Sequence, residues 1–360
     1  MKLLAPLCLF ALLAPLLSAA EWRIETVAGT GETGFSGDGG PATAAQLGTP
    51  FGVVRGPDGA IWFCEYTGQR IRRIAKDGTI STIAGTGTKG YTGDGGPALE
   101  ATFNQPHEIR FDAAGNLYVA DMVNNAIRRI DAKTHIITTL AGNGQRGYSG
   151  DGGPAKDAVF SSPHSLQFGP DGSLYICDVN NNAIRRIDLK TGLIHAFAGT
   201  GKPGLTPDGA PIAGTPLRAP RSIDFDRAGN LWLATREGNQ VFRFDLKAGI
   251  IHHIAGTGEP GFTGDGGPAK LAKLNGPKGI ALDPEGNIWL VDTESHTVRR
   301  VNAKTGIISL AIGTGQKGND DEHDPLRCAL NRPHGIFIDP DGTVLIGDSE
   351  SSRMRVLRKK

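Results

Sequence analysis

Residues 106–130 read PHEIRFDAAGNLYVADMVNNAIRRI, and close variants of this stretch recur along the chain of 360 residues. The stretch holds three short apolar segments, at residues 106–111, 117–120 and 126–130. Residues 112–115 and 124–125 separate them, and there Asp and Asn bond their own backbone while Gly allows a positive φ. This pattern is typical of three short antiparallel strands joined by tight turns.

Six prolines mark the repeat, because each of them opens an apolar segment: Pro50, Pro106, Pro163, Pro220, Pro277 and Pro333. Neighbouring prolines lie 56 or 57 residues apart. After the third segment of each unit comes a further turn, such as residues 190–192, and then a fourth apolar segment, such as residues 193–198. Four short strands in a repeat of this length predict one blade of a β-propeller.

The two ends of the chain predict how the ring of blades closes. A fourth-strand segment at residues 24–28 precedes the first proline-led strand, whereas the unit that begins at Pro333 offers only three strands before Lys360. We expect residues 24–28 to complete that last blade, which removes open sheet edges. The prediction is an all-β, six-bladed β-propeller of four-stranded antiparallel blades, forming a single domain over residues 21–360.

The repeat resembles the NHL repeat family. The resemblance rests on the Pro-x-[Gly/Ser]-Ile strand starts, on Gly-Asn-Leu-Tyr-Val-Ala-Asp at residues 115–121 and on Asn-Asn-x-Ile-Arg-Arg-Ile at residues 124–130. It covers residues 22–360 and implies the propeller fold. Propellers of this type carry diverse functions, so the resemblance alone does not define an activity.

Residues 1–20 are expected to lie outside the propeller. Lys2 precedes an apolar run from Leu3 to Leu17, and the small residues Ser18, Ala19 and Ala20 follow it. This order is typical of a secretory signal peptide. The run is shorter than the roughly 20 residues needed to cross a bilayer. We therefore expect cleavage near Ala20, a secreted or periplasmic protein, and no membrane span in the mature chain.

The net charge limits the classes of partner, and the cysteine content bears on disulfides. Without Lys2, 37 basic residues balance 37 acidic ones, whereas nucleic-acid binding favours a basic excess. Cys64 and Cys177 occupy the same place in two repeats and Cys328 is the third cysteine after residue 20, so small buried side chains are expected rather than a disulfide framework. The expected protein is a monomer whose partner is an extracellular small molecule, a glycan or a protein, with no nucleic acid.

A glycine-rich loop links neighbouring blades. It reads Gly-Tyr-Thr-Gly-Asp-Gly-Gly-Pro-Ala at residues 90–98, and each copy holds one acid: Asp38, Asp94, Asp151 and Asp265. Carboxylates are calcium ligands, but a single carboxylate in each loop favours a turn in which Asp accepts hydrogen bonds from nearby backbone amides. Residues 97–103 predict one or two helical turns with Pro97 in the first helical position.

The residue after each repeat proline is the main candidate for a site. In the propeller architecture, these positions ring one mouth of the central channel, where ligands of such folds bind. They are Phe51, His107, His164, Arg221, Lys278 and His334. Five of these six are basic or titratable, which a scaffold does not need. We predict that the ring binds a ligand, with Arg221, Lys278 and the histidines suited to an anionic one.

Two further repeat positions are of interest: the one that Glu108 occupies and the last residue of the second strand. Glu108 stands where the other repeats carry Gly or Ser, so it is either a catalytic base beside His107 or a salt-bridged surface residue. The second strands end in an acid that is expected to cap the following turn: Glu65, Asp121, Asp178, Asp292 and Asp348. The fourth repeat has Thr235 instead and lacks the double arginine, reading Phe242-Arg243.

Three functions stay open on the sequence. The first is a secreted ligand- or protein-binding module, and the third is a structural role at the cell surface. The second is a metal-dependent lyase, lactonase or other hydrolase. Its basis is that the Pro-His-x-[Ile/Leu] segments at His107, His164 and His334 resemble those that hold zinc in the peptidylglycine amidating lyase, a six-bladed relative whose ligands come from alternate blades. Streptogramin-lyase-like propellers are also similar. The cofactor implied is a divalent metal, Zn or Ca.

Overall fold

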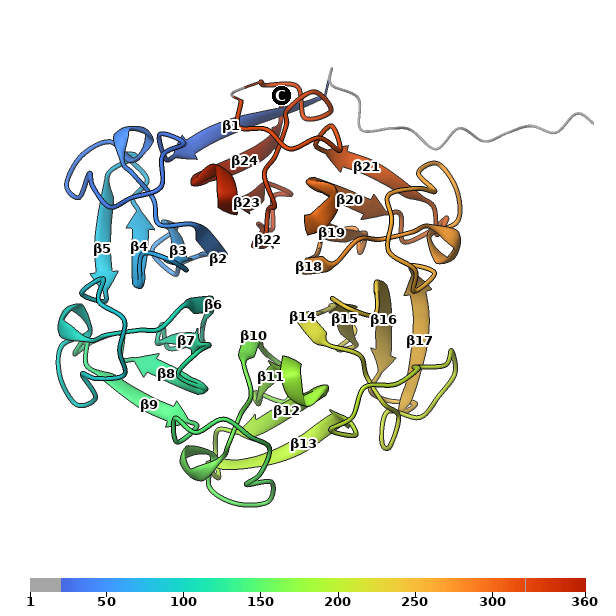
Figure 1. Ribbon diagram of the computed structural model, residues 1–360, viewed down its shortest axis with the longest axis horizontal. Coiled ribbons are helices and arrows are strands. Elements are labelled where there is room, and N and C mark those ends of the chain that lie inside the picture. Colours follow the sequence, from blue (N-terminus) through green and yellow to red (C-terminus); the bar gives the residue numbers. More distant parts are fainter. Residues whose placement is uncertain (1–20, 321) are drawn as a thin grey trace, which may run out of the picture.

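The computed structural model describes residues 21–320 and 322–360, which form a ring of six blades arranged around one axis (Figure 1). In these residues, strands β1 to β24 make six four-stranded antiparallel sheets. Five sheets contain consecutive strands, and the sixth has the order β1-β24-β23-β22. The predicted all-β six-bladed propeller is therefore confirmed. The expected signal peptide, residues 1–20, lies outside the described residues.

Each blade runs from an inner strand near the axis to an outer strand at the rim (Figure 1). Blades one and two consist of β2 (Pro50–Arg55), β3 (Ile61–Glu65), β4 (Arg70–Ile74), β5 (Ile80–Ala84), β6 (Pro106–Phe111), β7 (Leu117–Asp121), β8 (Ala126–Ile130) and β9 (Ile137–Ala141). Blades three and four consist of β10 (Pro163–Phe168), β11 (Leu174–Asp178), β12 (Ala183–Asp188), β13 (Leu193–Gly199), β14 (Pro220–Phe225), β15 (Leu231–Thr235), β16 (Gln240–Asp245) and β17 (Ile250–Ala255). Blades five and six consist of β18 (Pro277–Leu282), β19 (Ile288–Asp292), β20 (Thr297–Val301), β21 (Ile308–Ile312), β22 (Ile336–Ile338), β23 (Val344–Asp348), β24 (Arg353–Lys359) and β1 (Trp22–Ala28).

The clasp between the first and last strands closes the ring as predicted. Strand β1 pairs antiparallel with β24, and Ile24 lies opposite Leu357. Both side chains are buried in an apolar cluster that also contains Trp22 and Trp289. This cluster spans blades five and six, so the clasp is held by apolar packing as well as by backbone hydrogen bonds.

The apolar core lies between neighbouring blades rather than inside any one of them. Tyr118 and Ile127 of blade two pack in one buried cluster with Leu166 and Leu174 of blade three. The rings of Tyr118 and Phe168 meet edge to face, with centroids 5.1 Å apart. Each sheet therefore buries both faces against its neighbours, which explains why its strands are apolar on both sides.

A buried ion-pair unit recurs in five of the six blades. Its centre is an arginine on the third strand that is at most 1% exposed: Arg72, Arg128, Arg185, Arg299 and Arg355. In blade three, Arg185 lies 3.6 Å from Asp178 and 2.9 Å from Asp151. Its guanidinium also lies over the ring of Tyr148, 5.0 Å from the centroid. Because two carboxylates and an aromatic ring surround it, the buried charge of Arg185 is matched internally.

The acids of the glycine-rich loops belong to these units. Asp38, Asp94, Asp151 and Asp265 pair with the buried arginines, at 2.7 to 3.0 Å. The predicted partners of these acids, nearby backbone amides, are therefore wrong. The loop folds back over the arginine, and the acid pairs with the guanidinium instead. The helical segment after the loop is a single 3₁₀ turn, Ala98–Glu100 between blades one and two, within the one or two turns expected. Pro97 is not in its first helical position as expected, because it precedes the turn with an extended ψ of 134°.

The acids that end the second strands tie together the loops around them. Asp178 accepts a hydrogen bond from the Asn181 side chain in the following turn, as expected, and another from the backbone N–H of Ser161. Burial raises the pKa of Asp178 to about 7 and that of Asp121 to about 6. The cysteines at positions 64, 177 and 328 are buried free thiols. None of the helical turns in the described residues is long or apolar enough to span a membrane.

Candidate functional site

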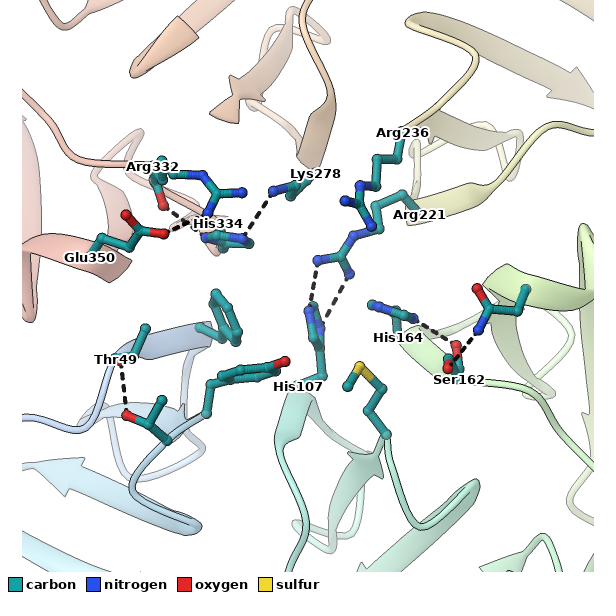
Figure 2. Close-up of a pocket in the computed structure, with 15 residues that line it drawn as sticks. Thr49, His107, Ser162, His164, Arg221, Arg236, Lys278, Arg332, His334 and Glu350 are labelled. Carbon is teal, nitrogen blue, oxygen red and sulfur yellow. Dashed lines mark hydrogen bonds and ion pairs between the residues drawn. The ribbon is translucent and has the colours of Figure 1, made fainter. Parts of the chain in front are cut away.

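One mouth of the channel forms a pocket of about 520 Å³. All six residues that follow the repeat prolines line it: Phe51, His107, His164, Arg221, Lys278 and His334. Figure 2 shows His107, His164, Arg221, Lys278 and His334 converging from different blades on the centre of the mouth. The structure thus brings the predicted ring together, while its role in binding a ligand stays a prediction.

The backbone at each strand start turns these side chains toward the axis. The residue before each repeat proline has a left-handed φ, for example 59° at Gln105 and 49° at Ala219. The pairing of the first and second strands then shifts register beside the proline, for example between Pro106 and Glu108. Such irregularities re-aim side chains at the end of a sheet. The left-handed residue recurs in all six blades and the register shift in five of them, and together they build the ring.

The blade-one side of the mouth is aromatic. The rings of Phe51 and Tyr66 meet edge to face, with centroids 4.3 Å apart. Phe51 also contacts the imidazoles of its two neighbours in the ring, with centroids 4.9 Å from His107 and 4.1 Å from His334. Met122 of blade two also lines the pocket. Phe51 is 6% exposed and Tyr66 is half-buried, so most of the aromatic surface open to the cavity belongs to Tyr66.

His107 is held neutral by a neighbouring cation. Arg221 donates from Nη2 to His107 Nε2 at 2.8 Å (Figure 2). A guanidinium carries no acceptor, so the imidazole nitrogen must accept this bond. Burial, and then the charge of Arg221, lower the pKa of His107 well below its ordinary value. His107 is therefore an uncharged acceptor at neutral pH.

His164 and His334 are also neutral, and the backbone fixes their tautomers. His164 donates from Nδ1 to the carbonyl of Ser162 at 2.6 Å, and His334 donates from Nδ1 to the carbonyl of Arg332 at 2.8 Å. Burial lowers the pKa of both, helped by Arg221 for His164 and by Lys278 for His334. Each Nε2 is thereby left as an acceptor. That of His334 lies 3.4 Å from the Lys278 amine.

The cations of blades five and six are matched by acids. Lys278 donates to Glu294 at 2.7 Å, and Arg332 bonds both Glu294 at 2.7 Å and Glu350 at 2.6 Å. Burial lowers the pKa of Lys278 to about 8. Burial opposes ionisation of Glu294, but hydrogen bonds from Arg332 and Lys278 outweigh it and hold its pKa at about 2. This side of the mouth is charged but balanced.

The cations of blade four have no such partners. Arg221 is 4% exposed, and its Nε has no hydrogen-bond partner. Among the described residues, no carboxylate forms an ion pair with Arg221 or with Arg236, which is exposed in the same pocket. Glu108 supports the charge of Arg221 only at longer range, since it is itself paired with Arg110. Burial, with the repulsion of Arg236, lowers the pKa of Arg221 to about 9.

Glu108 has neither of the two positions expected from the sequence. It is 8% exposed, so it is not a surface residue, and it does not line the mouth pocket. Its carboxylate pairs with Arg110 two residues along the same strand. Burial raises the pKa of Glu108 against the effect of Arg110. A catalytic role at the mouth would require it to leave this ion pair.

The residues present do not fit the zinc or calcium site considered from the sequence. Across residues 21–320 and 322–360, no three His, Cys, Asp or Glu side chains are grouped so as to hold a metal ion. Arg221 lies against Nε2 of His107, and Lys278 lies against Nε2 of His334. A metal cation would have to bind at these same nitrogens. The loop acids, in turn, are paired with the buried arginines.

Several residues of the pocket were missed from the sequence. Tyr66, Met122 and Arg236 line it, and each follows the last residue of its second strand. Each also lies fifteen positions after the mouth residue of its own repeat. The loops that join second to third strands open on the same face as the repeat prolines. This constant spacing is therefore the sequence signal that could have identified the three residues.

Comparison with known proteins supports the repeat assignment. The family model described as Teneurin NHL domain matches residues 257–329, and the NHL repeat model matches residues 330–357. Protein SUPPRESSOR OF QUENCHING 1, chloroplastic, of Arabidopsis thaliana is 28% identical over 293 residues, which are 77% of this chain and 27% of that protein. NHL repeat-containing protein 2 of Gallus gallus is 28% identical over 316 residues, 80% of this chain and 43% of that protein. The chain thus spans less than half the length of these curated relatives.

Solved structures share the architecture. An auxiliary nutrient binding protein from Bacteroides thetaiotaomicron has a TM-score of 0.67 at 16% identity, covering 94% of this chain and 76% of that one. A streptogramin B lyase has a TM-score of 0.56 at 16% identity, covering 95% of this chain and 100% of that one. At these identities the likeness concerns the fold alone.

Proposed function

Because this chain is a six-bladed propeller of NHL-type repeats, as its sequence predicted, we propose that it is a binding module for an anionic small molecule at the channel mouth. One observation carries the proposal. Arg221 is buried at the centre of the pocket with an imidazole for a partner and no carboxylate in ion-pair contact. A buried charge without a counter-charge is destabilising unless a ligand supplies one.

The rest of the ring supports an anion in the same place. The three imidazoles of the ring are neutral: His107, His164 and His334. They therefore neither repel a cation nor balance the positive charge of Arg221. The acids at the mouth, Glu294 and Glu350, are already bonded to Lys278 and Arg332. The uncompensated charge is therefore positive and sits on blade four. A carboxylate or phosphate accepts the two parallel N–H groups that a guanidinium offers.

The proposal includes secretion of the protein, on the basis of the sequence of residues 1–20. A secreted binding module would meet extracellular solutes. The solved propeller described as an auxiliary nutrient binding protein has a binding role of this general kind. That binding role belongs to the solved protein, and it makes small solutes the first class of ligand to screen here.

A catalytic role on the bound anion is the second candidate, and His164 favours it. Its Nδ1 proton is fixed by the Ser162 carbonyl, which leaves Nε2 directed away from the backbone as a neutral proton acceptor. Such a tautomer-locked imidazole is unprotonated and can accept a proton in a lyase or hydrolase reaction, although its lowered pKa makes it a weaker base than an ordinary histidine. Metal analysis of the purified protein separates this reading from a metal-dependent one. We expect no stoichiometric zinc or calcium, whereas stoichiometric zinc that is lost in His107→Ala would restore the metal-dependent reading.

A thermal shift series tests the binding proposal. Phosphate should raise Tm above a sodium chloride control of equal ionic strength, since a ligand at 100-fold its Kd stabilises by about 2.7 kcal/mol. The double variant Arg221→Met, Arg236→Ala should lose this shift. Arg218→Ala is the matched control, because Arg218 is an exposed arginine of blade four outside the mouth. An equal phosphate response in the double variant and the wild type would overturn the proposal.

A further inference from the structure

The mouth pocket is chemically polarised, and we propose that its ligand is polarised in the same way. The ligand is an aromatic or similarly flat apolar ring that carries an anionic group. Its anionic group lies against Arg221 and Arg236, and its ring lies against Phe51 and Tyr66. This inference rests on the proposed function and names the class of ligand that the same site would take.

The two ends of the pocket come from opposite blades. Blade one and blade four face each other across the six-membered ring in Figure 1. In Figure 2, Arg221 and Arg236 enter from one side, and Thr49 of blade one lies on the other. The Arg221 guanidinium reaches the centre of the mouth, where it bonds His107 at 2.8 Å, and Phe51 of the aromatic wall stacks on that imidazole at 4.9 Å (Figure 2). A ligand that satisfies both must have its charge at one end and its apolar part at the other.

The aromatic wall has the properties of a binding surface. Phe51 and Tyr66 present two rings at an angle, and Met122 adds a flexible apolar side chain elsewhere in the lining of the same pocket. Aromatic pairs of this edge-to-face kind contribute attraction beyond the area that they bury. The Tyr66 hydroxyl makes no hydrogen bond to any residue that the structure describes, so it is available to a polar substituent of the ligand.

The size of the pocket argues against a bare inorganic anion as the natural ligand. The cavity of about 520 Å³ lies within the range that holds small organic molecules. Phosphate occupies roughly the space of three waters, at about 30 Å³ each. An inorganic anion beside Arg221 would therefore leave the aromatic side of the pocket in contact with water only.

The anionic group is a carboxylate or a phosphate, since both accept parallel hydrogen bonds from arginine. Calorimetric titration of the full-length protein with four probes distinguishes them: inorganic phosphate, phenyl phosphate, acetate and benzoate. We expect phenyl phosphate to bind about tenfold more tightly than phosphate if its ring is buried against the wall. The same ratio for benzoate over acetate would identify a carboxylate site, and a ratio near one for that pair would restrict the site to phosphate.

A variant on the aromatic wall locates the gain. Tyr66→Ala should reduce the ratio of phenyl phosphate to phosphate affinity from about ten to about two, because one of the two rings is removed. Tyr91→Ala is the matched control. Tyr91 is an exposed tyrosine of a glycine-rich loop, outside the mouth, and its removal should leave the ratio unchanged.

The outcomes separate the inference from the proposed function. Equal affinity for phosphate and phenyl phosphate, and for acetate and benzoate, would overturn the inference and leave the anion-binding proposal intact. Failure of all four probes to bind would overturn the anion-binding proposal itself. If Tyr66→Ala does not fold, the ratios measured on the wild type still decide the question, since they need no variant.

Discussion

Blade three and blade four both bury an arginine, but they place it in opposite surroundings. Arg185 of blade three is fully buried between Asp178 and Asp151. Arg221 of blade four is 4% exposed and is bonded to a neutral imidazole. The residue type and the burial are the same, so the difference lies in the partners. A buried arginine that is matched by its own chain belongs to the scaffold, whereas an unmatched one at a cavity indicates a ligand.

Blade four differs from the others in every partner of the unit. Phe242 stands in place of the third-strand arginine and Thr235 in place of the second-strand acid. Asp208 keeps the position of the loop acid, but it pairs with Lys270 at 2.9 Å on the surface. Leu205, 86% exposed, stands where four other loops carry an aromatic ring over the arginine. The scaffold unit is therefore absent from the blade that supplies the uncompensated cations of the mouth.

The largest expected effect comes from removing a matched arginine. Arg185→Met leaves Asp178 and Asp151 without their cation, and loss of one partner of a buried pair costs about 3–5 kcal/mol. Urea unfolding should show this loss. Arg186→Met, its neighbour with a third of its side chain exposed, should cost no more than about 1 kcal/mol. Equal losses in the two variants would mean that the buried unit does not stabilise the blade.

Restoring the unit in blade four is the next largest test. Phe242→Arg alone should be strongly destabilised, because it buries a cation beside Thr235. Adding Thr235→Asp should recover about 2–3 kcal/mol of that loss through the new ion pair, which a double-mutant cycle measures. The control is Thr235→Asp in the Phe242 background, which should be destabilising. Strictly additive free energies would show that the partners in the other blades are not coupled either.

Removing the unmatched arginine should have the opposite sign. Arg221→Met relieves a buried charge without leaving an orphaned acid, so the unliganded protein should gain about 1–2 kcal/mol of stability. Thermal melts without added anion provide the measurement. Arg236→Met, at an exposed position, should change the free energy of unfolding by less than about 0.5 kcal/mol. A destabilised Arg221→Met would place Arg221 in the scaffold class.

The smallest expected effect is a pH dependence of anion affinity. Burial lowers the pKa of Lys278 to about 8 and that of Arg221 to about 9, so between pH 7 and pH 9 the amine becomes largely neutral and Arg221 loses part of its charge. Sulfate, a dianion over this range, should therefore bind about fivefold more weakly at pH 9 than at pH 7. Lys278→Met should bind more weakly but with less pH dependence. Affinity that rises with pH in the wild type would contradict a role for Lys278.

The fold was predictable from the sequence because it depends on spacing. Prolines every 56 or 57 residues set the blades, and the missing fourth strand after Pro333 located the clasp at β1 and β24. The one shortfall is the first strand of blade six, which is reduced to β22 at Ile336–Ile338. The identity of the mouth residues followed from the same spacing, since equivalent positions of a closed ring face the same axis.

The contacts within the site were not predictable in the same way. Spacing shows that His107 and His334 occupy equivalent places, but not that Arg221 and Lys278 reach across blades to their ring nitrogens. For the same reason Asp151 was assigned to its own turn, although it lies 34 positions before Arg185 and pairs with it. Side-chain partners depend on rotamers and on the angle between blades, and a repeat pattern contains neither.

The clasp has a consequence for the order of folding. Strand β1 begins the described chain, and its only sheet partner is β24, which ends it. Because the ribosome makes the chain from its N-terminus, β1 emerges long before its partner β24 has been made. Closing so large a loop carries a substantial entropic penalty, which the other five blades reduce by assembling first. The circle is consequently sealed only once β24 has been made, and removal of residues 353–360 would leave both β1 and β23 with unpaired backbone.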